Sequence, residues 1–114
     1  RPWSSAASDV YKRQDLLTLA ADVAAQRPEL GVRGAQMIGE DEVGTLRRFG
    51  YRAICIAGRD PASGTLPHWH RPDDTVETIS GAFLERAADW MMALLEALDD
   101  QMLNTQEENA CARL

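Results

Sequence analysis

Apolar residues recur at helical spacing in two stretches of the chain. The first stretch follows Asp15, whose side chain is suited to capping a helix N-terminus. Its apolar positions fall on one helical face: Leu16, Leu19, Ala20, Val23 and Ala24. Pro28 ends the pattern, because proline cannot donate a backbone hydrogen bond to a continuing helix. The sequence therefore predicts an amphipathic helix between Asp15 and Pro28.

The second stretch has the strongest helical pattern of the sequence. Ser80 is predicted to be its N-cap, and we expect the helix to end near Leu103. The predicted apolar face comprises Phe83, Leu84, Ala87, Met91, Leu94, Leu95 and Leu98. Trp90, Met91 and Met92 belong to the same helix, and we expect them to lie in the core rather than at a cofactor site.

Shorter patterns lie between the two long ones. Acidic residues open a segment from about Asp41 to Phe49, arginines close it and Gly50 follows, which is typical of a short helix with its C-cap. Residues 32–38 are weakly strand-like. The segment from Tyr51 to Ala57 is apolar apart from Arg52, which predicts a strand buried on both faces. Helices would then cover a mostly parallel sheet, so the predicted fold class is α/β.

Length and charge narrow the function classes. The 114 residues suffice for one small domain. Because 18 acidic residues outnumber 12 basic ones, the net charge is −6, which disfavours a nucleic-acid partner. No apolar run approaches the ~20 residues that a membrane span needs.

The two cysteines lie in different surroundings. Cys55 lies in an apolar run and Cys111 in a polar tail, so we expect free thiols rather than a disulfide between them.

Residues 1–14 show neither helical nor strand periodicity and resemble a translated adapter sequence. We expect them to be a non-native or disordered leader, with the natural N-terminus missing. The credible folded portion is then 15–103, and residues 104–114 are predicted to form a frayed polar tail.

Candidate chemistry lies in the Gly/Pro-rich loop from Gly58 to Pro72 and just after it, in the run His68-Trp69-His70-Arg71-Pro72-Asp73-Asp74-Thr75. Imidazole binds zinc well, and Asp73 or Asp74 is near enough to hold its second nitrogen. The spacing alone favours a solvated loop over a metal site, with His68 solvated or bonded within the loop and Trp69 either lining a pocket or anchoring the loop by packing.

A family resemblance strengthens the metal interpretation. Several motifs resemble the C-terminal portion of zinc exopeptidases. The first is the start of the predicted strand, Gly50-Tyr51-Arg52-Ala53-Ile54, followed by the Gly/Pro-rich loop. The second is Trp69-His70-Arg71-Pro72-Asp73-Asp74-Thr75, followed by Glu77, Ile79 and a long helix. These exopeptidases are the aminopeptidase Y and aminopeptidase S type, peptidase family M twenty-eight, related to glutaminyl cyclases. The resemblance covers about Leu16 to Leu103. Arg52 and Arg71 replace the usual proline and Thr or Ser.

The resemblance implies an α/β zinc aminopeptidase fold, two zinc ions and hydrolysis of N-terminal residues from peptides. It places His70 as the final zinc ligand. Asp74 and Thr75 would hold the ligand loop in shape, and Trp69 and Asp41 would line the substrate pocket.

The family's other zinc-site residues have no counterpart in this sequence. They are a histidine, a bridging aspartate, adjacent glutamates and a further acid. We therefore expect a C-terminal fragment of a metallo-aminopeptidase that is inactive alone. Two alternatives stay open: a non-catalytic α/β interaction module, and a metal-sensing domain that binds zinc through His68 and His70.

Overall fold

The computed structural model describes residues 3–35 and 42–113, with the side chains of the first helix described from Asp15 onward. The elements are helix α1 (Trp3–Gln26), 3-10 turn η1 (Pro28–Leu30), helix α2 (Glu42–Arg48), 3-10 turn η2 (Val76–Thr78) and helix α3 (Gly81–Cys111). Within the described ranges the chain forms no β-strand. The predicted α/β fold is therefore wrong, and the described fold is helical.

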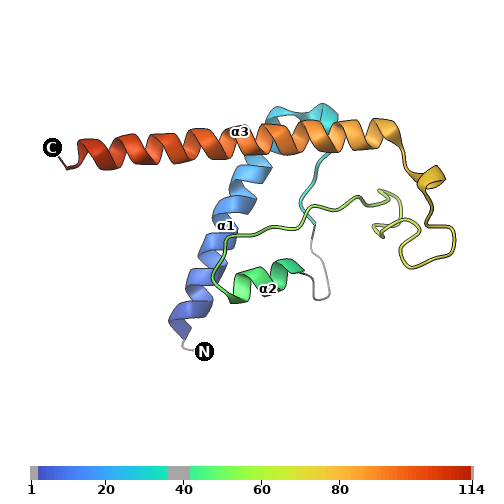
Figure 1. Ribbon diagram of the computed structural model, residues 1–114, viewed down its shortest axis with the longest axis horizontal. Coiled ribbons are helices and arrows are strands. Elements are labelled where there is room, and N and C mark those ends of the chain that lie inside the picture. The colour runs from blue at the N-terminus through green and yellow to red at the C-terminus, as the bar shows by residue number, and fades with distance from the viewer. Residues whose placement is uncertain (1–2, 36–41, 114) are drawn as a thin grey trace.

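A single helix contact forms the core. The C-terminal part of α1 meets the middle of α3, and the rest of α1 extends away from α3 at a steep angle (Figure 1). The buried apolar side chains come from α1, η1 and α3: Leu16, Ala20, Val23, Leu30, Trp90 and Leu94. The predicted inner face of the first helix is confirmed, because three of its five positions are buried and the other two half-buried.

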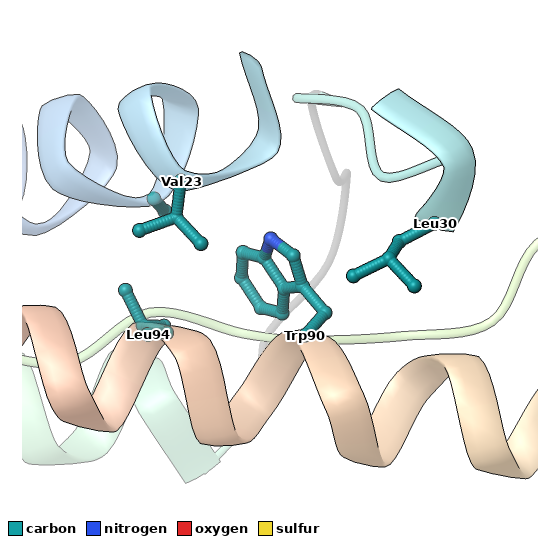
Figure 2. Packing of buried hydrophobic residues seen from close by; sticks show 5 residues of the cluster. Val23, Leu30, Trp90 and Leu94 are labelled. Atoms are coloured by element: carbon teal, nitrogen blue, oxygen red, sulfur yellow. The ribbon is translucent and has the colours of Figure 1, made fainter. Parts of the chain in front are cut away.

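Trp90 lies at the centre of this contact and is only 3% exposed. Its indole extends from α3 into the space between Val23 of α1 and Leu30 of η1 (Figure 2). Gly31 closes η1 with a left-handed φ of 69°, and its amide donates to the Pro28 carbonyl at 3.2 Å. This turn directs Leu30 back onto the core, as a glycine at such a position readily permits.

Two of the observed helix ends agree with the predictions from the sequence, and two differ from them. Ser80 caps α3, because its Oγ accepts from the Phe83 amide at 3.3 Å, and α1 stops before Pro28. Asp15, however, lies inside α1 rather than at its start. The α3 helix also continues past Leu103 to Cys111, so the predicted frayed tail is wrong. No glycine or proline interrupts those last residues. That residues 1–14 are non-native stays a prediction.

Much of the predicted apolar face of α3 is exposed. Leu94 is buried and Ala87 and Leu98 are half-buried, whereas Met91 is 41% and Met92 57% exposed, so the core prediction for the two methionines is wrong. The reason is the geometry of the contact, in which α1 crosses α3 instead of lying along it. The radius of gyration is 17.3 Å, against about 13 Å for a compact domain of this length.

The segment from Tyr51 to Ala57 has no regular secondary structure. Its backbone begins with a hydrogen bond from the Tyr51 amide to the Leu46 carbonyl at 3.1 Å, and the Arg47 side chain donates to the Ala53 carbonyl at 2.9 Å. Ile54 packs against the core, but Tyr51 and Ile56 are exposed. The strand prediction fails because a strand needs a partner for its backbone groups, and the described chain offers none.

Two further predicted elements lie partly outside the residues that the structure describes. Helix α2 confirms the short helix, although Asp41 lies outside the described residues. Residues 32–35 form no strand, and 36–38 lie outside as well. Among the helices that the structure describes, none is both long enough and apolar enough to cross a membrane.

Trp90→Ala should lower the free energy of unfolding by about 3 kcal/mol or more, because it empties the centre of the core. Urea unfolding followed by circular dichroism measures this change. Met92→Ala, two positions away and exposed, is the matched control and should change stability by less than about 0.5 kcal/mol. Equal losses in the two variants would contradict the assigned core.

Candidate functional site

The segment that carries the predicted chemistry is a long loop at the N-terminal end of α3, away from the α1 contact (Figure 1). At its start, the ring of Phe83 lies against Gly58. A Cβ at Gly58 would stand 2.9 Å from the ring Cζ atom, so glycine permits this close approach. At its end, the loop joins α3 through Ser80. The loop is therefore attached to α3 at both ends.

A tight turn around Asp60 forms the first part of the loop. The Asp60 carboxylate accepts from the Ser63 hydroxyl at 2.7 Å and from the Ala62 amide at 3.0 Å. The backbone closes the same turn, with the Asp60 amide donating to the Thr65 carbonyl at 2.9 Å. The hydrogen bond from Ser63, followed by that from Ala62, lowers the pKa of Asp60.

Asp73 joins the two ends of the histidine-containing turn. One carboxylate oxygen lies 3.0 Å from Nδ1 of His68, and the other accepts from Nε of Arg71 at 2.9 Å. The hydrogen bond with His68 is the largest cause of a lowered pKa for Asp73, and Arg71 adds to it. His68 is thus bonded within the loop, one of the two roles that the sequence left open.

His70 stands on the outside of this turn. Its backbone is left-handed, with φ at 57°, and its side chain is exposed. The ring stacks at a tilt on Trp69, with 4.4 Å between the ring centroids and 35° between the planes. Neither ring nitrogen has a hydrogen bond to any residue that the structure describes. The imidazole is therefore open to a ligand that approaches from outside.

Trp69 is 61% exposed, so the anchoring role in which it pins the loop by packing is wrong. Its indole instead forms an apolar surface beside the imidazole of His70. That placement is compatible with the expected pocket-lining role, which stays a prediction. Asp41, the other residue expected to line the pocket, lies outside the described residues.

Asp74 and Thr75 lead the loop into η2. The Asp74 amide donates to the Arg71 carbonyl at 3.1 Å, and the Thr75 amide to the Asp73 carbonyl at 3.0 Å. The Thr75 hydroxyl hydrogen-bonds to Glu77 and lowers the pKa of that carboxylate. Both residues support the loop, but neither side chain is hydrogen-bonded to His70.

The described residues do not make a complete metal site. Among these residues, no three His, Cys, Asp or Glu side chains lie close enough together to hold a metal ion. Zinc sites in proteins use three or four such ligands. Cys55 and Cys111 are exposed thiols that form no disulfide. His70 therefore fits the role of one ligand, while the described residues do not fit the whole centre.

An open groove of about 590 Å³ lies elsewhere, between α1 and α3. Asp15, Asp22 and Arg52 contribute charged groups to its lining. None of the predicted site residues that the structure describes takes part in it, so the groove and the histidine loop are separate features.

Comparison of the chain with known protein families, curated proteins and solved structures found no match. The histidine loop is therefore described from its own geometry alone. Sequence reasoning expected a carboxylate to hold the ligand histidine, and it missed that Asp73 holds His68 and Arg71 instead. The five-residue separation of His68 and Asp73 matches no regular helix or strand spacing, so only the course of the turn reveals the pair.

Acidification should disorder the Asp60 turn. The lowered pKa of Asp60 means that the turn is stabilised above the unfolded-state pKa of about 3.9 and loses this stabilisation as the pH falls through the folded-state value. The Ala62 amide resonance, followed by NMR, should shift in that acidic range. Asp60→Asn is the control and should show no such titration. A wild-type Ala62 resonance that does not move would contradict the assigned bond.

Proposed function

We propose that this chain supplies one zinc ligand, His70, to the centre of a zinc-dependent aminopeptidase that hydrolyses N-terminal residues from peptides. The observation that supports it is the exposed imidazole of His70, with both ring nitrogens unbonded to described residues and the indole of Trp69 beside it. This imidazole stands in the run Trp69-His70-Arg71-Pro72-Asp73-Asp74-Thr75, on which the resemblance to zinc exopeptidases depends.

In this proposal the chain contributes binding rather than catalysis. A zinc ion would polarise the substrate and activate a water molecule, and His70 would donate one ring nitrogen to it. Trp69 would present its apolar ring to the side chain of the substrate's first residue. The proposal requires the remaining ligands and the general base to come from outside the described residues, and we therefore expect the chain by itself to be inactive.

The proposal also accounts for the apolar side chains that α3 leaves exposed. Leu84, Leu95 and Met102 are all more than half exposed in the described part of the chain. A helix that packs on a larger enzyme domain would bury such residues.

The same exposed side chains favour a second candidate function, a non-catalytic interaction module. The helical fold removes the α/β form of that alternative. A helical module that docks through α3 is still compatible with the structure. The third alternative, zinc sensing through His68 and His70, has less support, because Nδ1 of His68 is already bonded to Asp73 and no third ligand lies near.

The natural reading frame around the codon for Asp15 tests the proposed function. We expect it to encode upstream a histidine, a bridging aspartate and an adjacent pair of glutamates. The enzyme expressed from it should release N-terminal residues from peptides. His70→Ala should then lower kcat/KM more than about 100-fold, since losing even a hydrogen-bond partner of a ligand can cost that much.

Arg59→Ala, in the same loop but outside the histidine turn, is the control and should keep both zinc and activity. A start codon directly before Asp15, or full activity in the His70→Ala enzyme, would contradict the proposal.

The solution state of the 114-residue chain separates the two candidate functions. If α3 normally packs on a larger domain, the isolated chain should self-associate into a mixture of sizes, seen by analytical ultracentrifugation. The triple variant Leu84→Ser, Met92→Ser, Leu95→Ser should reduce this association. Gln101→Ser, on the same helix, is the control. A clean monomer or dimer at all concentrations would favour the interaction module instead.

A further inference from the structure

The carboxylate of Asp73 bridges the residues on both sides of His70. Its Oδ2 lies 3.0 Å from Nδ1 of His68, two positions before His70, and its Oδ1 accepts from Nε of Arg71, one position after. Each oxygen thus has a different side-chain partner. A single carboxylate spans the turn that carries the candidate ligand.

This turn has a backbone that needs support. His68 and His70 both have left-handed φ values, 60° and 57°, which non-glycine residues rarely adopt because of steric contacts with Cβ. One backbone hydrogen bond closes the turn, from the Arg71 amide to the His68 carbonyl at 3.0 Å. No buried residue lies in the turn, because residues 69–80 are exposed and His68 is only half-buried. Side-chain bonds are therefore the other means of holding it.

We propose that Asp73 is a positioning residue, which fixes the turn through His68 and Arg71 and thereby sets the direction in which the His70 imidazole faces. The use made of His70 rests on the proposed function, whereas the order that Asp73 imposes is a property of the metal-free chain. The lowered pKa of Asp73 agrees with this role, because it keeps the carboxylate ionised and so a strong acceptor for both partners.

The neighbouring aspartate, Asp74, differs from Asp73 in its side-chain contacts. Its backbone amide donates to the Arg71 carbonyl, but its side chain has no hydrogen bond to a described residue. The two aspartates are adjacent and both exposed. They therefore provide a matched pair for substitution by asparagine, which keeps the shape and removes the charge.

The experiment compares Asp73→Asn with Asp74→Asn in the full, metal-free chain by NMR. In the wild type, we expect His68 to carry its proton on Nδ1, and His68 and His70 to show the strong cross-relaxation between amide and Hα protons that a positive φ produces. Asparagine has an NH2 donor in place of one of the two carboxylate oxygens, so it cannot accept at both positions. Asp73→Asn should therefore give a mixture of His68 tautomers and weaken the cross-relaxation at both histidines, while Asp74→Asn leaves these signals unchanged.

Circular dichroism should show the same helix content in both variants, because the loop does not contribute to the Trp90 core. Unchanged His68 and His70 signals in Asp73→Asn, or equal changes in both variants, would overturn the positioning role. Because no zinc or substrate is present, this failure is distinct from failure of the proposed function, which would appear as a start codon directly before Asp15 or as full activity without His70.

Discussion

The insertion of the Trp90 indole between α1 and η1 is the contact on which the rest of the structure depends. It joins the two long helices, and the turn closed by Gly31 adds Leu30 to the same cluster. The indole Nε1 has no hydrogen-bond partner in the described part of the chain, so apolar packing must outweigh an unpaired donor. Because this core is small, removing one large side chain would affect the whole helical arrangement.

The histidine loop is held in a different way. Local hydrogen bonds around Asp60 and Asp73 shape it, and the contact of Phe83 with Gly58 attaches it to α3. Such a loop can keep a definite turn without being buried, because its bonds are made between residues close in sequence. The same construction leaves His70 exposed and without a second metal ligand among the described residues. A metal centre that included His70 would have to take its other ligands from outside the loop.

The open shape of the molecule leaves much of α3 and the histidine loop without a covering partner among the described residues. Helix α3 extends past its contact with α1 on both sides, which leaves apolar side chains such as Leu84 and Met102 exposed. Apolar surface of this kind is stabilised by a covering partner. A larger peptidase domain, as proposed, would supply both the cover for α3 and the other ligands for His70.

The sequence by itself determined the local features: the inner face of α1, the stop at Pro28, the cap at Ser80 and the short helix α2. Each depends on interactions within a few residues, where spacing and side-chain chemistry suffice. Only the tertiary structure decided that residues 51–57 form no strand, that Met91 and Met92 are exposed, and that Asp73 binds His68. A strand requires a distant partner, burial requires a neighbour that lies alongside, and the path of a turn determines which carboxylate meets which imidazole.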